Sequence, residues 1–337
     1  MPAPAIEVED LHYAYRRSGG RRLALDGLSF RVERGEIFGL LGPNGAGKTT
    51  AVRILTTLLK PTSGRAVVEG FDVVREPLAA RRRLAAVFQE TSVEVMLSTW
   101  DNLLLYGYLH GLSREEAPRR AREVSDLLEL GDYLGQRAQG LSGGYKRRLQ
   151  VAKALMVETP VLFLDEATTG MDPLIKRRIV QAIHEQAARG RTVVMTTQLL
   201  DEAEQLCDRM VLMNRGTAMA AGKLSELRAL SRKVFDIRLA FSEPGEEATR
   251  ALRELGPRTI EDEDGEVLLV VEGSEDEWIR KMARISERFP LARFEIRGAT
   301  LEEIFVELYG ADDAAREVAR AGGIDGGPGP VPGGPAT

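Results

Sequence analysis

The chain has 337 residues, of which 43% are hydrophobic and 29% charged, a balance typical of a globular protein long enough for more than one domain. Its formal net charge of −5 argues against a general nucleic-acid binder, because such proteins usually carry a basic surface. The single cysteine, Cys207, excludes an internal disulfide and fits a reducing cytosol, where we expect it to be an inert packing residue.

Residues 5–70 predict strands separated by turns, followed by a loop and a helix. Ile6 and Val8 alternate with acidic residues, and residues 28–32 alternate in the same way, which indicates half-buried antiparallel strands. The stretch EIFGLL that follows is continuously apolar, as expected of a strand buried on both faces.

The next stretch, GPNGAGKTT (42–50), matches the phosphate-binding pattern G-x-x-x-x-G-K-T between a predicted strand and a predicted helix. Backbone N–H groups of such a loop curl around an anion, and the following helix points its positive end at it. Lys48 is placed to reach the β- and γ-phosphates, and the Thr49 hydroxyl is a candidate ligand of Mg²⁺. The predicted phosphate-binding residues are Gly42, Pro43, Asn44, Gly45, Ala46, Gly47, Lys48, Thr49 and Thr50. The loop by itself leaves ATP and GTP open.

Residues 90–158 have a helical pattern rich in Leu, Arg and Glu. Apolar runs at 161–165, 192–197 and 209–214 then alternate with helical segments, which predicts a parallel sheet covered by helices. The first of these runs, VLFLD, ends in Asp165, a position from which a carboxylate can hold Mg²⁺, often through water. Glu166 follows directly and could orient and deprotonate an attacking water.

Beyond residue 232 the pattern shifts to strands and helices in the order β-α-β-α-β, closed by a helix at 300–309. We expect residues 233–310 to form a small α+β domain. Its predicted core residues are Trp278, Phe289, Phe294, Phe305 and Tyr309. Residues 311–337 end in a stretch rich in Gly and Pro, which predicts a disordered tail.

The stretch LSGGY (141–145) lies between the two phosphate-site motifs, and at this point residues 5–230 resemble the ATP-binding subunits of ABC transporters, whose signature is LSGGQ. The resemblance implies an α/β P-loop NTPase fold: a RecA-like core, an antiparallel β subdomain and an α-helical signature subdomain at about 90–158. It also implies ATP and Mg²⁺ as cofactors. In this family Ser142, Gly143 and Gly144 would cap the γ-phosphate bound to the loop of a second copy, so that a homodimer encloses two ATP molecules.

The same resemblance assigns roles to three further single residues. Gln89 resembles the glutamine that contacts Mg²⁺ and senses the γ-phosphate, and Asp172 the aspartate that reaches across the dimer. Tyr15 matches the aromatic residue that stacks on adenine, with Tyr13 as the alternative.

Three positions differ from the family pattern: Tyr145 replaces Gln in the signature, Ala167 replaces Pro, and Gln198 replaces the switch histidine. Glutamine can donate a hydrogen bond to the γ-phosphate, but unlike histidine it cannot titrate. We expect Gln198 to keep the phosphate contact and Glu166 to be the main base. The alternative is a soluble or regulatory ATPase with low turnover and no transport role.

The ending ATLEEIFVELYG and Gln198 resemble the daunorubicin-resistance type of ABC exporter. This resemblance implies export of a drug, lipid or other hydrophobic compound, with antibiotic resistance as a consequence. No apolar run approaches the ~20 residues that span a bilayer, so we expect a cytoplasmic protein held at the inner membrane face by a separate membrane-spanning subunit.

A cytosolic helix of that subunit would dock on residues 90–111, where Val93, Val95, Met96, Leu97 and Trp100 are either a docking patch or part of the subdomain's own core. The sequence has basic runs at 16–17 and 21–22, at 81–83 and at 146–148, and each is interpreted as a solvated face of a helix or loop.

Overall fold

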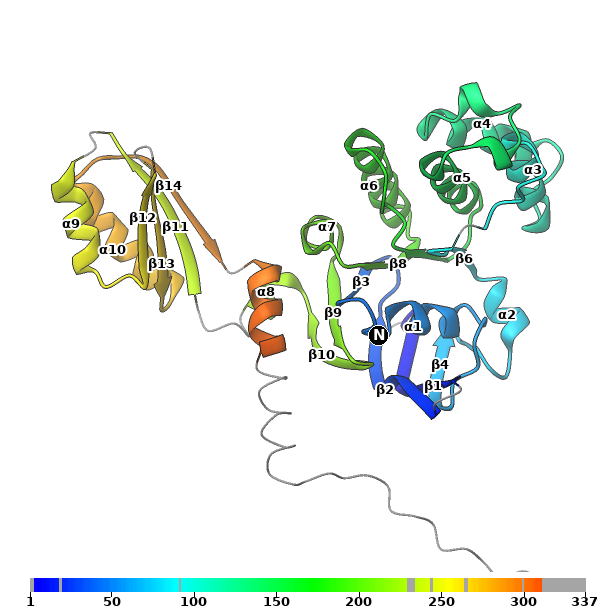
Figure 1. The fold of residues 1–337 in the computed structure, drawn as a ribbon, viewed down its shortest axis with the longest axis horizontal. Helices are drawn as coiled ribbons and strands as arrows, with labels where there is room; N and C mark the ends of the chain where they lie inside the picture. Colours follow the sequence, from blue (N-terminus) through cyan, green and yellow to red (C-terminus); the bar gives the residue numbers. More distant parts are fainter. Residues whose placement is uncertain are drawn as a thin grey trace, which may run out of the picture. The chain divides into compact units, whose positions relative to one another are not determined.

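The computed structural model describes residues 3–17, 20–90, 92–228, 234–242, 245–263, 266–298 and 300–310. The chain divides into two compact units, Met1–Leu227 and Arg228–Thr337 (Figure 1). The predicted disordered tail, 311–337, lies outside the described residues.

The first unit contains a six-stranded sheet in the order β10-β9-β3-β8-β7-β6. Its strands are parallel except for β10, which is antiparallel to β9. They are β3 (Ile37–Leu41), β6 (Leu84–Val87), β7 (Val161–Asp165), β8 (Thr192–Thr197), β9 (Arg209–Asn214) and β10 (Thr217–Gly222). The carboxyl ends of β3, β7 and β8 lie together at one edge, which is where ligands bind in open parallel sheets.

A second, four-stranded antiparallel sheet has the order β2-β1-β4-β5. It is built from β1 (Ile6–Arg17), β2 (Gly20–Val32), β4 (Ser63–Val68) and β5 (Phe71–Asp72). Helix α1 (Lys48–Leu55) packs between the two sheets, because its apolar residues share one buried cluster with strands of both (Figure 1). The fold therefore places the start of α1 beside the antiparallel sheet as well as at the edge of the parallel one.

Consecutive residues of the central strands face opposite sides of the parallel sheet. Phe163 belongs to the cluster around α1, whereas Leu162 and Leu164 belong to the cluster on the other face. Helices cover that other face, as Figure 1 shows for α5 and α6. The remaining helices of the unit are α2 (Pro77–Arg81), α3 (Thr99–Leu109), α4 (Glu116–Leu127), α5 (Gly143–Leu155), α6 (Pro173–Ala188), α7 (Leu200–Leu206) and α8 (Leu224–Arg228). The predicted α/β class, with a parallel core, an antiparallel sheet and a helical segment, is confirmed.

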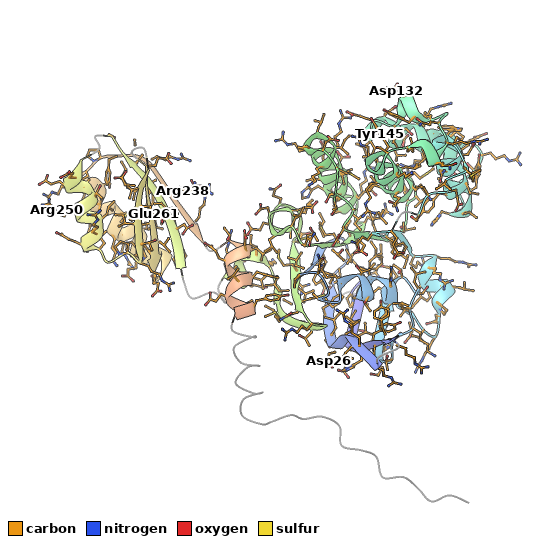
Figure 2. All side chains as sticks on the ribbon, in the orientation of Figure 1. Asp26, Asp132, Tyr145, Arg238, Arg250 and Glu261 are labelled. Atoms are coloured by element: carbon orange, nitrogen blue, oxygen red, sulfur yellow. The ribbon has the colours of Figure 1, made fainter. Side chains whose placement is uncertain are left out.

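The second unit has its own antiparallel sheet, in the order β12-β13-β11-β14. Its elements are β11 (Val234–Phe241), α9 (Glu246–Glu254), β12 (Thr259–Glu263), β13 (Glu266–Glu272), α10 (Glu275–Arg288) and β14 (Leu291–Gly298), and residues 301–310 are also helical. Trp278 is fully buried in a cluster with strand residues, so the unit has a core separate from that of the first unit. Charged side chains such as Arg250 and Glu261 lie on its outside (Figure 2).

Two expectations for this unit were wrong. Phe294 is 41% exposed and is not a core residue. Strand β12 was not predicted, because its sequence TIEDE is mostly acidic and acidic residues are uncommon in strands. Such residues are tolerated here because β12 is an edge strand, where charge also discourages pairing with another chain.

Candidate functional site

The phosphate loop connects β3 to α1, as the pattern predicts. Gly47 directly precedes the helix with φ of 105°, and a Cβ there would lie 2.6 Å from the Ala24 carbonyl oxygen. Only glycine fits such a left-handed position against a neighbouring backbone. No side chain caps the start of α1, so its first N–H groups are available to an anion.

A cleft of about 250 Å³ opens over this loop. It brings together parts of the chain that lie far apart in the sequence: the antiparallel sheet, the phosphate loop, the end of β6 and the end of β7. Its lining residues are Tyr15, Arg22, Leu23, Ala24, Asn44, Gly45, Ala46, Gly47, Lys48, Thr49, Thr50, Gln89 and Glu166.

Lys48 is buried, and its ammonium group lies against the loop itself. Its Nζ donates to the carbonyl oxygens of Gly42 at 2.6 Å and Pro43 at 3.1 Å. Burial lowers the pKa of Lys48, while the charges of Glu166 and Asp165 oppose that shift. The loop thus holds a cation at its centre, in the place where phosphate oxygens would need one.

Asp165 is fully buried at the end of β7, and within the described part of the chain only one of its two carboxylate oxygens accepts hydrogen bonds. Its Oδ1 accepts from the Thr49 hydroxyl at 3.3 Å and from the Thr196 hydroxyl. Its Oδ2 has no hydrogen-bond partner among the described residues. A buried carboxylate oxygen without a partner is costly unless a ligand completes it, and oxygen donors are those that Mg²⁺ prefers. Asp165 and Thr49 therefore fit a Mg²⁺ ion.

Glu166 adopts an uncommon backbone conformation, with φ of 50°. Its N–H donates to the Thr196 carbonyl at 3.1 Å, which fixes the turn at the strand end. Its Oε2 accepts from Gln89 Nε2 at 3.1 Å. A non-glycine residue at positive φ is often found where function requires a fixed geometry. The Glu166 carboxylate thus lies at the cleft together with Gln89.

Tyr15 lines the cleft, and its hydroxyl lies 3.3 Å from that of Thr50. Tyr13 instead packs against the buried cluster around α1 and contacts Tyr15 edge-on. Of the two tyrosines weighed for adenine stacking, Tyr15 is the one on the cleft wall.

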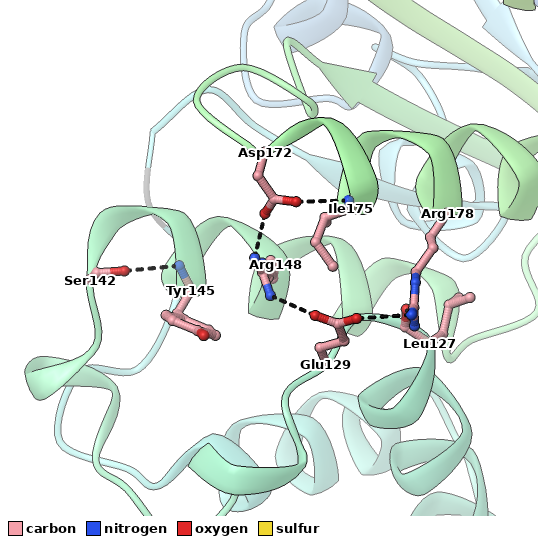
Figure 3. A network of polar contacts seen from close by, with 8 residues as sticks. All are labelled: Leu127, Glu129, Ser142, Tyr145, Arg148, Asp172, Ile175 and Arg178. Atoms are coloured by element: carbon pink, nitrogen blue, oxygen red, sulfur yellow. Dashed lines mark hydrogen bonds and ion pairs between the residues drawn. The ribbon is translucent and has the colours of Figure 1, made fainter.

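Eight predicted site residues do not line this cleft. Gly42 and Pro43 belong to the phosphate loop and accept from Lys48, and Asp165 accepts from Thr49. The other five are Ser142, Gly143, Gly144, Asp172 and Gln198. Ser142 precedes α5, and its Oγ accepts from the Tyr145 N–H at 3.4 Å, so it caps that helix (Figure 3). Gln198 follows the end of β8 and is exposed. Within one chain the signature segment and the phosphate loop form separate surfaces.

Asp172 ties α6 to the signature helix. Its Oδ1 accepts from the Ile175 N–H at 3.1 Å, and its Oδ2 lies 2.6 Å from Arg148 of α5 (Figure 3). The Ile175 N–H and the Arg148 charge hold the pKa of Asp172 below its usual range. Glu129 adds a second link, to Arg148 at 3.8 Å and to Arg178 at 2.9 Å. These ion pairs connect the helical segment to α6, the helix that follows β7.

Arg147 was missed, and its assignment to a solvated face is wrong. It is only 9% exposed, and its guanidinium points into the protein from α5. It donates to the carbonyl oxygens of Asp165 at 2.6 Å, Glu166 at 2.7 Å and Ala167 at 3.2 Å, and also to that of Phe88. The only sequence signal is its spacing: on α5 it lies four residues from the buried Val151, on the same helix face.

The apolar residues after Gln89 divide into two groups. Val93 is buried and Trp100 packs on the subdomain core, whereas Val95 and Met96 are 44% and 64% exposed. Among the described residues no helix is long and apolar enough to cross a membrane.

Comparison with known proteins places these features in one family. The sequence matches the ABC transporter family over residues 25–169. It is 38% identical to the daunorubicin/doxorubicin resistance ATP-binding protein DrrA of Streptomyces peucetius, over 95% of this chain and 97% of that protein. It is 35% identical to the Nod factor export ATP-binding protein I of Paraburkholderia xenovorans, over 93% of this chain and 99% of that protein.

Solved structures of ATP-binding cassettes superpose on this chain. The ATP-binding subunit of an ABC transporter superposes with a TM-score of 0.63 at 29% identity, covering 67% of this chain and 92% of that chain. A dimeric ATP-binding cassette in a post-hydrolysis state with ADP and Pi superposes with a TM-score of 0.60 at 25% identity, covering 65% of this chain and 98% of that chain.

Proposed function

Because this chain belongs to the ABC transporter family and is an ATP-hydrolysing subunit of its exporters, we propose that the cleft over the phosphate loop is its ATPase site. The observation that carries this proposal is the convergence of Lys48, Gln89 and Glu166 on that cleft, with Asp165 buried directly behind it.

Each residue then has a role in the chemistry. The loop residues Gly42 to Thr50 bind the phosphates through N–H groups, and Lys48 faces the β- and γ-phosphates. Thr49, Gln89 and Asp165 would hold Mg²⁺, which when bound neutralises charge on the phosphates. Glu166 takes a proton from the attacking water, and Gln89, which already bonds its carboxylate, keeps it oriented.

The residues outside the cleft are proposed to act in a homodimer. Ser142, Gly143 and Gly144 lie at the start of α5, and the N–H groups of such a helix start attract an anion. In the dimer they would cap the γ-phosphate bound by the second copy, with Asp172 close by, while Gln198 contacts the γ-phosphate of its own site. The dimeric cassette among the similar structures supports this arrangement.

A separate membrane-spanning subunit would complete the transporter and hold this chain at the inner face of the membrane. Exposed Val95 and Met96 are proposed to receive a helix of that subunit, since they are exposed apolar side chains in the segment that follows Gln89, through which docking could reach the site. The names of the relatives suggest a drug or another hydrophobic compound as cargo. The alternative of an ATPase without a transport role finds no support among these relatives.

The first test is Mg-ATP turnover and oligomeric state for the wild type and for Glu166→Gln. We expect turnover in the wild type, a loss of at least about a hundredfold in the variant because a general base is removed, and an ATP-stabilised dimer of the variant. Turnover that persists in Glu166→Gln would eliminate Glu166 as the base. Glu185→Gln, an exposed carboxylate on α6, is the matched control and should retain full activity.

A further inference from the structure

We propose that Arg22, which lies in none of the sequence motifs, binds the phosphate chain of ATP from the side of the antiparallel sheet; this inference rests on the proposed ATPase site. Arg22 is on β2, and its cross-strand neighbour on β1 is Tyr15. Residues directly opposite each other in an antiparallel pair project from the same face of the sheet. Arg22 and Tyr15 therefore share one wall of the cleft, and both line it.

The guanidinium of Arg22 lies against the phosphate loop. A Cβ placed on Gly45 would be 3.6 Å from Arg22 Nη2. Gly45 has φ of 84° and carries no side chain, so the guanidinium meets loop backbone there. The Arg22 guanidinium beside Gly45 therefore lies close to the loop N–H groups that would bind phosphate oxygens.

The charge of Arg22 is available to a ligand. None of the ion pairs among the described residues involves Arg22, whereas Arg31, also on β2, pairs with Glu7, and Arg53 of α1 pairs with Glu90. The loop's own cation, Lys48, is engaged with loop carbonyls. A planar guanidinium can donate two parallel hydrogen bonds to a phosphate, which an ammonium group cannot do.

A competing role would be stacking of the guanidinium on adenine beside Tyr15. The position of Nη2 at Gly45 favours the phosphate, because Gly45 belongs to the loop that encloses the phosphates. The two roles differ in what they predict for ligands that lack one part of ATP.

The experiment measures binding of ATP, tripolyphosphate and adenosine by competition against a fluorescent ATP analogue, using the full chain in the Glu166→Gln background to prevent turnover. Arg22→Ala should weaken ATP and tripolyphosphate about tenfold, the loss expected for one charge-assisted contact in a partly solvated cleft, and leave adenosine within about twofold. Arg22→Lys should recover part of the affinity because it keeps the charge. Arg21→Ala is the matched control: it is the adjacent residue on β2, projects from the other face and does not line the cleft.

Each outcome is decisive. Unchanged ATP affinity in Arg22→Ala, or an equal loss for ATP and adenosine, would overturn the phosphate contact, and the second result would assign Arg22 to the base. A protein that binds no ATP even with Arg22 intact would overturn the proposed function instead. Lys48→Ala, measured in parallel, should lose ATP whichever role Arg22 has.

Discussion

At the scale of single residues, the site is defined by how each polar atom is satisfied. Asp165 Oδ1 has two hydroxyl donors while Oδ2 has none among the described residues, an asymmetry that matches a metal-binding carboxylate. Glu166 has a positive φ, its N–H is bonded to the Thr196 carbonyl of β8, and its carboxylate is bonded to Gln89. These contacts fix both carboxylates in position, which is the preorganisation that the proposed hydrolysis requires.

Gln198 stands where the family has its switch histidine, so substitutions of Gln198 test whether its side chain contacts the γ-phosphate. If its amide donates to the γ-phosphate, Gln198→Ala should lower kcat by about ten- to a hundredfold with little change in KM, because the contact strengthens as charge develops in the transition state. Gln198→His should restore activity. Steady-state kinetics decide this, with exposed Gln205→Ala of α7 as the control. Equal kcat in Gln198→Ala and the wild type would remove Gln198 from the mechanism.

At the scale of elements, the structure shows how α5 is joined to β7 and to the start of α6. Arg147 crosses from α5 to the carbonyls that follow β7, and Arg148 pairs with Asp172 at the start of α6. Two adjacent arginines of one basic run therefore make different contacts: Arg147 is buried under the turn that carries Glu166, and Arg148 lies at the start of α6, which Asp172 caps. Their different burial follows from the helix period.

Arg147→Ala should destabilise the protein and impair hydrolysis together. It leaves several buried carbonyls without their donor, which costs about 3 kcal/mol in free energy of unfolding, and it loosens the turn that carries Glu166. Urea unfolding followed by circular dichroism, together with turnover, measures both effects. The neighbouring Lys146→Ala should leave both unchanged, because Lys146 makes a single exposed contact to the Gln139 carbonyl. An Arg147→Ala protein as stable as the wild type would show that water satisfies these carbonyls.

The element scale also shows what could be read from the sequence. Continuous apolar runs and the phosphate-loop pattern predicted the parallel strands, the loop and the positions of Asp165 and Glu166, since these signals are local. The buried Arg147 and the cleft-lining Arg22 were not predicted, because their contacts are with residues distant in the sequence. Strand β12 was not predicted because its sequence is mostly acidic. The sequence pattern of a basic run does not distinguish an arginine that faces solvent from one that donates to buried carbonyls. The sequence likewise could not show that residues of both sheets line one cleft, because those residues meet only in the folded chain.

At the scale of the whole molecule, the second unit carries its own core around Trp278. We propose that it stabilises the dimer or regulates turnover, since its segment resembles the C-terminal module of exporter subunits and the family match in the first unit ends before it.

Deletion of residues 233–337 should leave the first unit folded and should weaken dimerisation, because that unit has a complete core of its own. Sedimentation velocity with ATP, in the Glu166→Gln background, measures the dimer, and turnover of the otherwise wild-type chain measures the coupling. Deletion of 311–337 alone is the control and should behave as the full chain does. Unchanged dimerisation and turnover after the larger deletion would leave the second unit without either role.

Tyr15 and Arg22 come from the antiparallel sheet, whereas the phosphate loop and Glu166 follow strands of the parallel one. In the proposed site Tyr15 contacts the base and Arg22 the phosphates, while the hydrolytic turn belongs to the other sheet. We therefore expect substitutions at Tyr15 to change the choice of base while the turn that carries Glu166 stays intact, so that nucleotide preference and hydrolysis can evolve separately.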